Sequence, residues 1–175
     1  MSEAELRQRL APVAGAETDG LLAAYRKAMP QASPSDRLIA ALTGSNFWIR
    51  TVVLAERYAA RRRAPVYMYS LDWPSPAHGG RLKAHHAMDL PFVFDNSDVA
   101  DTTARAPGAR ELAARISATW IAFARNGTPD NPAIPPWTAY SGRERATMIL
   151  DNACRVVHDP DREARLLWSR VVAHD

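Results

Sequence analysis

Residues 79–96 bring together side chains that could transfer protons, namely the adjacent histidines His85 and His86, two of the five histidines of the chain, and the acidic residue Asp89. An imidazole has a pKa near neutrality, so a histidine can take a proton from a hydroxyl group and later return it to a leaving group. Most histidines in proteins are surface or satisfied core residues without such a role. The residue types alone therefore suggest general acid–base chemistry in this segment but do not assign it to one histidine.

The single cysteine, Cys154, excludes an internal disulfide. Its neighbours in the sequence include no histidine that could activate the sulfur, so we expect an inert thiol. The composition, 47% hydrophobic and 23% charged residues, is that of a soluble globular protein, and 175 residues can bury a core. We expect no metal site and no cofactor.

The charge of the chain is mildly basic, with a formal net charge of +3 and a pI near 9.3. The basic residues are scattered apart from Arg61-Arg62-Arg63, which we expect at the C-terminal end of a helix, where cations suit the helix dipole. A nucleic-acid partner would require a clustered basic face, so we expect none. No apolar run approaches 18 residues and no signal segment precedes the first helix, so we expect no membrane partner and a cytoplasmic location.

Hydrophobic periodicity and proline positions predict the elements that would hold these side chains. A Ser33-Pro34-Ser35-Asp36 start signal begins a helix that Gly44 is expected to break. The other predicted helices span residues 3–11, 18–28, 46–62, 109–125 and 160–172, and the predicted strands span residues 65–72 and 147–151. The strand at 65–72 is apolar on both alternations, as in an inner strand of a parallel sheet. Residues 74–108 form a long connection, which is often functional, and no linker divides residues 1–175, so we expect a single unit.

Four separated segments of the sequence resemble the last third of type-B carboxylesterases, the para-nitrobenzyl-esterase-like enzymes of the α/β-hydrolase fold. They are residues 65–76, the histidine segment 79–96, residues 118–129 with the pattern Trp-x-x-Phe-Ala-Arg-x-Gly-x-Pro, and residues 134–151. Their order and spacing also fit the family. The resemblance implies the C-terminal portion of an α/β-hydrolase fold, helix-rich with two or three sheet strands.

This resemblance implies that His86, just before Ala87-Met88-Asp89-Leu90-Pro91-Phe92, is the catalytic general base and acid of a serine esterase with an acyl-enzyme mechanism. His85 has no assigned role in the family. Asp89 is too close in sequence to His86 for the acid of a triad, whose members come from distant segments, so we expect Asp89 to shape the loop. The family's activity is carboxylic ester hydrolysis and needs no metal or organic cofactor.

The nucleophile that His86 would serve is missing from the sequence. In α/β-hydrolases the chain order is serine, acid and then histidine, and no Gly-x-Ser-x-Gly motif or His-Gly-Gly-Gly loop precedes His86. Asp36, Glu56 and Asp72 are weak candidates for the acid. We therefore expect an absent N-terminal, nucleophile-bearing part, a truncated and inactive chain, and an exposed sheet edge beside residues 66–71.

The partners predicted from this are a small-molecule carboxylic ester in a complete site, and either an N-terminal companion segment or a second copy of the chain. An alternative is a non-catalytic esterase-like interaction module or an inactive fragment. Three further residues, Tyr67, Met88 and Phe92, could line an ester pocket, but we expect them to pack in the core. The sequence does not specify the ester.

Overall fold

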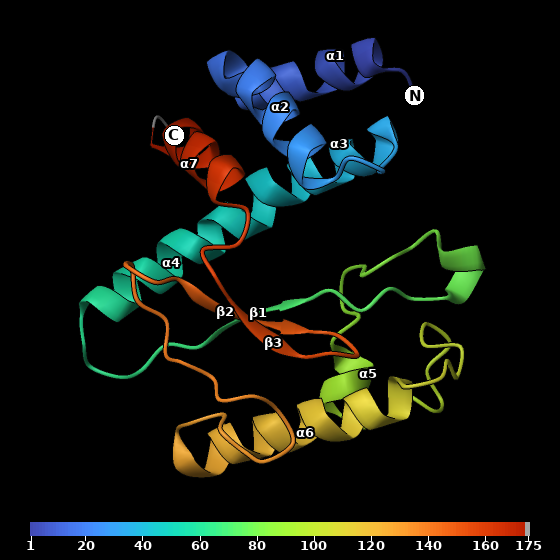
Figure 1. The fold of residues 1–175 in the computed structure, drawn as a ribbon, viewed down its shortest axis with the longest axis vertical. Coiled ribbons are helices and arrows are strands. Elements are labelled where there is room, and N and C mark those ends of the chain that lie inside the picture. The colour runs from blue at the N-terminus through green and yellow to red at the C-terminus, as the bar shows by residue number, and fades with distance from the viewer. Residues whose placement is uncertain (174–175) are drawn as a thin grey trace. The chain divides into compact units, whose positions relative to one another are not determined.

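The structure, a computed structural model, describes residues 1–173 and contains mainly helices and one small sheet (Figure 1). Its elements in chain order are α1 (Glu3–Ala14), η1 (Gly15–Glu17), α2 (Thr18–Ala28), α3 (Pro34–Thr43), η2 (Gly44–Trp48), α4 (Ile49–Ala60), β1 (Met68–Leu71), η3 (Ala77–Gly80), α5 (Leu90–Val93), α6 (Ala109–Asn126), β2 (Ala146–Leu150), β3 (Arg155–His158) and α7 (Arg162–Val172).

Two compact units divide these elements. One comprises residues 1–57 and the segment from Pro160 onward, and the other comprises residues 58–159. The first unit is helical, and in it α7 packs against α2 although the two helices lie far apart in the sequence. The second unit contains the sheet and the histidine segment. That residues 1–175 act as a single unit stays a prediction.

The start signal at Ser33 is confirmed. The Ser33 side chain accepts a hydrogen bond from the backbone amide of Asp36, and the Asp36 carboxylate accepts one from the Ser33 amide, which together form a capping box. Pro34 stands in the first turn, where its missing N–H leaves no hydrogen bond unmade. These local interactions suffice to begin α3 where the sequence predicts it.

The prediction that Gly44 breaks this helix is wrong. Residues Gly44–Trp48 form a π-helical turn that joins α3 to α4, so one continuous helix runs from Pro34 to Ala60. A Cβ on Gly44 would lie within 3.0 Å of the Tyr25 hydroxyl and of Nε1 of Trp168. Glycine therefore stands here because two aromatic side chains approach the helix backbone, and not because the helix ends.

This continuous helix is long and apolar enough to cross a membrane by length and composition, with a mean hydropathy of 1.4 over its best window. Core helices of soluble proteins pass the same test, so the finding is weak evidence for a membrane span. The basic side chain of Arg50 lies within the helix, and a charge near the middle of a membrane span is costly. The expectation of no membrane partner stays a prediction.

The sheet of the second unit has the order β1-β2-β3. β1 runs parallel to β2, with Met68 opposite Thr147, and β2 runs antiparallel to β3, with Ala146 opposite His158. The parallel pair agrees with the predicted strands, while β3 was not among the two strand ranges predicted. Among residues 1–173 no strand pairs with the other side of β1, so β1 is an edge strand in this part of the chain, and exposure of that edge to solvent stays a prediction.

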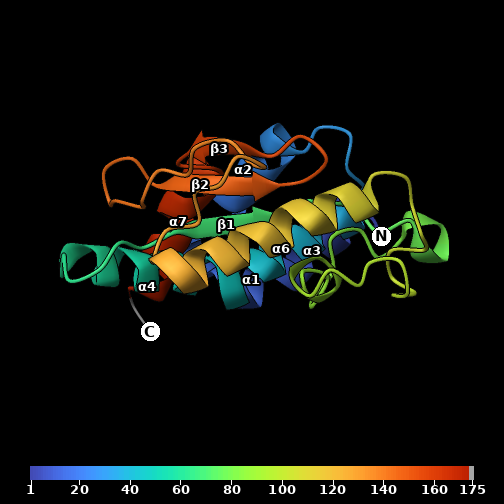
Figure 2. The same ribbon diagram turned by 90° about the horizontal axis from the view of Figure 1, so that it is seen from below.

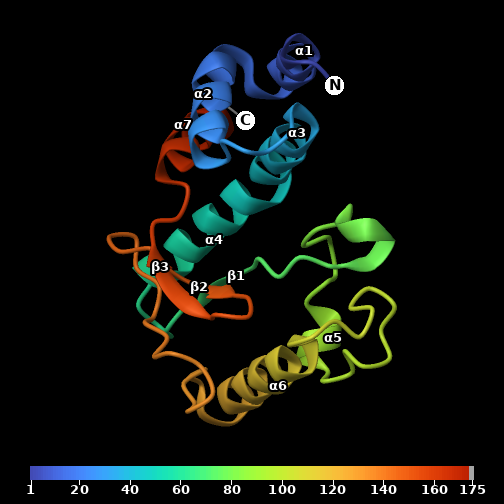
Figure 3. The same ribbon diagram turned by 45° about the vertical axis from the view of Figure 1, so that its right-hand side comes forward.

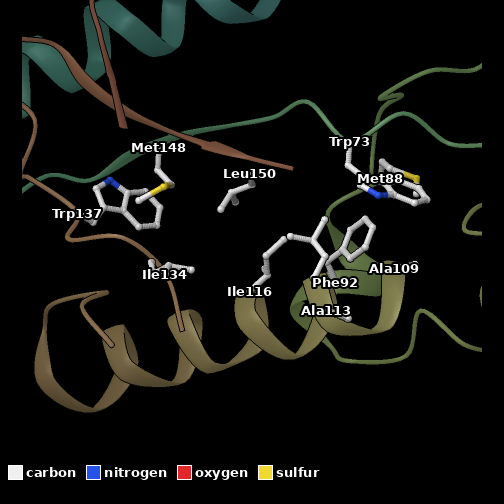
Figure 4. Packing of buried hydrophobic residues seen from close by; sticks show 11 residues of the cluster. Trp73, Met88, Phe92, Ala109, Ala113, Ile116, Ile134, Trp137, Met148 and Leu150 are labelled. Carbon is white, nitrogen blue, oxygen red and sulfur yellow. The ribbon is translucent and has the colours of Figure 1, made fainter. Parts of the chain in front are cut away.

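Helix α6 follows the prediction closely and runs along the sheet (Figure 2). It ends at Gly127, whose φ of 72° gives the left-handed cap typical of helix ends, and Pro129 lies just beyond. On its apolar side Leu112 and Ile116 are fully buried, while Phe123 near the C-terminal end is 48% exposed. Figure 4 shows this side facing Met148 and Leu150 of β2, which with the residues around them form the core of the unit.

Candidate active site

The histidine segment belongs to the connection between β1 and α6, which is pinned at both ends. Trp73, just after β1, is buried in the core and packs edge-on against Phe92, with ring centroids 5.2 Å apart (Figure 4). The Ser75 amide donates to the carbonyl of Lys83 at 3.0 Å, and the Ser75 hydroxyl donates to the carbonyl of Thr102. The long connection is thus an ordered loop with its own internal hydrogen bonds.

His86 lies in a tight turn within this loop. The Met88 amide donates to the His85 carbonyl at 3.1 Å, and the Leu90 amide donates to the Ala87 carbonyl at 3.2 Å. Ala87 has a φ of 63°, a left-handed conformation that a non-glycine residue adopts at a cost of about 1 kcal/mol. The strained turn leaves the His86 side chain exposed, while the side chain of Met88, two residues on, is 1% exposed.

His85 and His86 differ in their surroundings. The ring nitrogen Nδ1 of His85 lies 2.8 Å from the His86 carbonyl oxygen, which can only accept, so this nitrogen carries the proton. The other ring nitrogen of His85, Nε2, is buried without a hydrogen-bond partner. The exposed ring is therefore that of His86, and the His85 ring is turned back onto the chain.

The Asp89 carboxylate has a partner on the sheet. The Tyr69 hydroxyl on β1 donates to Oδ2 of Asp89 at 3.0 Å. Burial, together with the Asp89 charge, raises the pKa of Tyr69 to about 12. The Asp89 backbone carbonyl also accepts from the amides of Phe92 and Val93 and so begins α5, which lies beside α6 in Figure 3. Asp89 therefore shapes the loop, and the contact with Tyr69 is one that sequence reasoning missed because 20 residues separate the pair.

The structure brings no acid and no nucleophile to His86 within residues 1–173, since no hydrogen bond or ion pair of its imidazole is found there. Of the weak acid candidates, Asp36 belongs to the α3 capping box, and Asp72 accepts from the Ser70 hydroxyl at 2.6 Å. Glu56 lies on α4. The three stay unsupported as triad acids.

The residues proposed for a pocket wall pack as expected. Met88 and Phe92 are buried in the core, and Tyr67 makes edge-on ring contacts with Phe123 and Trp137. A hollow of about 420 Å³ lies at the start of α6, but the residues that line it, Ser97, Asp98, Val99, Arg105, Ala106, Ala109 and Arg110, do not include His86. Among residues 1–173 no group of three or more histidine, cysteine or acidic side chains could hold a metal ion.

The fold of the chain is shared with solved esterases. The solved carboxylesterase from Geobacillus stearothermophilus superposes with a TM-score of 0.78 at 30% identity, over 96% of this chain and 35% of that chain. An esterase from Clostridium hathewayi, described as hydrolysing aliphatic aromatic polyesters, superposes with a TM-score of 0.72 at 27% identity, over 98% of this chain and 33% of that chain.

The sequence comparisons give the family. The model of the carboxylesterase family matches residues 16–168, so the chain belongs to this family. It is similar to the para-nitrobenzyl esterase of Bacillus subtilis, with 38% identity over 127 residues, which are 71% of this chain and 25% of that protein. It is also similar to the phenmedipham hydrolase of Pseudarthrobacter oxydans, with 31% identity over 61% of this chain and 22% of that protein. The chain thus spans about a quarter of the length of these curated relatives.

Proposed function

We propose that this chain takes part in the hydrolysis of carboxylic esters by a serine-esterase mechanism and supplies its general base, His86. Membership of the carboxylesterase family supports the reaction class. The observation that carries the residue assignment is the exposed His86 ring. It lies in a hydrogen-bonded turn, and Met88, two residues after His86, anchors that turn in the core. A base on a loop after a strand can reach a nucleophile presented at the strand ends.

The reaction that we propose for His86 has two proton transfers in each half. The imidazole takes the proton of a serine hydroxyl as the serine oxygen bonds to the ester carbonyl carbon, and then gives this proton to the departing alkoxide. A water molecule next loses a proton to the imidazole and attacks the acyl-serine, and the serine recovers the proton as the acid leaves. No redox partner, metal or organic cofactor is needed for these steps.

The serine and its oxyanion donors must come from a segment that this sequence does not contain. The partners we propose are accordingly a small carboxylic ester and a nucleophile-bearing companion segment. The absence of nucleic-acid and membrane partners and a cytoplasmic location stay predictions from composition. A non-catalytic interaction module is the second candidate, favoured by the lack of any acid or nucleophile at His86 in residues 1–173.

A chimera separates these two candidates. In it, this chain replaces the matching quarter of the Bacillus subtilis para-nitrobenzyl esterase, and the turnover of a p-nitrophenyl ester is measured. We expect serine-type turnover that a fluorophosphonate blocks, and a loss of about 10³-fold or more in kcat for His86→Ala. The control His78→Ala changes an exposed histidine of the same loop and should leave kcat unchanged.

Two results would contradict the proposal. A soluble, folded chimera without turnover would favour the interaction module. Full turnover in the His86→Ala chimera would remove His86 as the base. The isolated 175-residue chain should show no more turnover than free imidazole, and robust fluorophosphonate-sensitive activity in it would show that a nucleophile had been overlooked.

A further inference from the structure

We infer that Tyr69 is a positioning residue that fixes the turn carrying His86, and that it acts through the Asp89 carboxylate. The inference rests on the proposed role of His86, since a fixed turn matters for catalysis only if this imidazole is the base. It adds a second residue to the site, one that lies on the sheet and outside the histidine segment.

The first step of the argument is that the His86 turn needs an external anchor. The turn is short, and its central residue, Ala87, is held at a φ of 63°, where a side chain other than glycine is strained. Strained backbone persists only where surrounding structure holds it. Two neighbouring residues supply that hold: Met88 lies in the core, and Asp89 is bonded to the sheet.

The second step is that Tyr69 is itself rigidly placed. Its backbone lies in β1 opposite Met148 of the central strand. Its ring packs edge-on against Trp120 of α6, with centroids 5.1 Å apart and planes at 78°. The hydroxyl is thus fixed by a strand and a helix together, and it meets Asp89 at 3.0 Å. The bond lies at the surface, and its acceptor is a charged carboxylate, which makes it stronger than an equally exposed bond between neutral groups.

The third step is that the bond persists over the working pH range of an enzyme. Burial and the Asp89 charge raise the pKa of Tyr69 to about 12, so its hydroxyl keeps its proton and can donate at neutral pH. Asp89, three residues after His86, then connects this donor to the turn through its own backbone. The carbonyl of the same residue begins α5, so one residue ties the His86 turn, the sheet and the next helix together.

The test uses the intact 175-residue chain and needs no esterase activity. Amide hydrogen exchange at Met88 and Leu90 reports opening of the turn, because these two amides close it. The proton resonances of the His86 ring report the placement of the imidazole. Tyr69→Phe keeps the ring packed on Trp120 and removes only the hydroxyl. We expect exchange at both amides to rise about tenfold and the His86 ring resonances to shift.

Tyr67→Phe is the matched control. It also removes a tyrosine hydroxyl, just before the same strand, but within the described residues that hydroxyl makes no hydrogen bond. It should leave both readouts unchanged. Asp89→Ala should reproduce Tyr69→Phe, and the double variant should show no further change. Asp89→Asn keeps an oxygen that can accept and should restore at least part of the slow exchange.

The outcomes separate this inference from the proposed function. Unchanged exchange and unchanged His86 resonances in Tyr69→Phe overturn the inference, as does an equal change in Tyr67→Phe. Lower stability to urea without local opening of the turn also overturns it, because that result fits a merely structural tyrosine. A failure of the esterase chimera would instead remove the role of His86 and leave these measurements on the turn standing.

Discussion

At the scale of single residues, the side chains near His86 divide into one exposed imidazole and a set of anchors. The His85 ring bonds to the His86 carbonyl, Met88 fills the core, and Asp89 meets Tyr69. This arrangement gives Asp89, three positions after His86, a structural role that involves no proton transfer. Asp89 holds the loop, and no acid bonds to the His86 imidazole within residues 1–173.

The buried residue Tyr25 gives a prediction at the same scale. The Trp168 Nε1–H donates to the Tyr25 hydroxyl at 2.9 Å, and burial raises the pKa of Tyr25 to about 12. A folded pKa above the unfolded value of 10 means that the folded state binds the proton more tightly, so this stabilisation is complete below pH 10 and is lost between pH 10 and 12. Its size is on the order of 2 kcal/mol.

We therefore expect the free energy of unfolding to fall between pH 10 and 12, and to fall less in Tyr25→Phe. At pH 8 this variant should itself be less stable by about 1–3 kcal/mol, because it leaves the Trp168 indole N–H buried without an acceptor. Urea unfolding followed by tryptophan fluorescence at a series of pH values measures both effects. Parallel pH curves for the two proteins would contradict the assignment to Tyr25.

At the scale of elements, the continuous helix Pro34–Ala60 shows how packing overrides local propensity. Glycine weakens a helix interior by about 1 kcal/mol relative to alanine, so Gly44 predicts a break. The break does not occur, because the space beside Gly44 is taken by Tyr25 and Trp168 and the helix accommodates them with a π-helical turn.

This reading predicts the sign of one substitution. Gly44→Ala would raise the stability of an ordinary helix, but here the added methyl group must displace two hydrogen-bonded aromatic side chains, so we expect a loss of about 1–3 kcal/mol. Gly142→Ala is the control, because a Cβ there meets nothing within 4 Å, and it should change stability by less than about 0.5 kcal/mol. Urea titration compares the two. A more stable Gly44→Ala protein would rule out the packing explanation.

At the scale of the whole molecule, the free side of β1 is the feature with the largest consequence. An unpaired strand edge is a template for pairing with another chain, and large apolar side chains, among them Phe94 at 70% and Val99 at 72% exposure, are also open to solvent. Solved esterases that superpose on nearly all of this chain are about three times as long as the part they share with it.

We expect the isolated chain to self-associate. Sedimentation velocity between about 1 and 100 μM should show a weight-average mass that rises above the monomer's 19.3 kDa. An excess of the non-matching three quarters of the Bacillus subtilis para-nitrobenzyl esterase should lower this association if it covers the same edge. A monomer at all concentrations would contradict the expectation.

The fold was predictable from the sequence wherever local interactions decide it. The capping box at Ser33, the left-handed cap at Gly127 and the apolar side of α6 are all formed by residues close in sequence. β3 was missed because its four residues are only partly buried and pair by a turn with β2. The family and the fold class are confirmed, while His86 as the base is a proposal that the resemblance first supplied.

Short-range caps, hydrophobic periodicity and a motif were enough to predict most of the longer helices, the parallel strand pair and the segment that carries the imidazole; the short helix α5 was not predicted. Three features became visible only in the folded chain: Gly44 lies inside a helix, Asp89 bonds to Tyr69, and the His86 ring is exposed while the His85 ring is turned back. Those three outcomes depend on which side chains from distant segments come within contact distance, and no local pattern records such contacts.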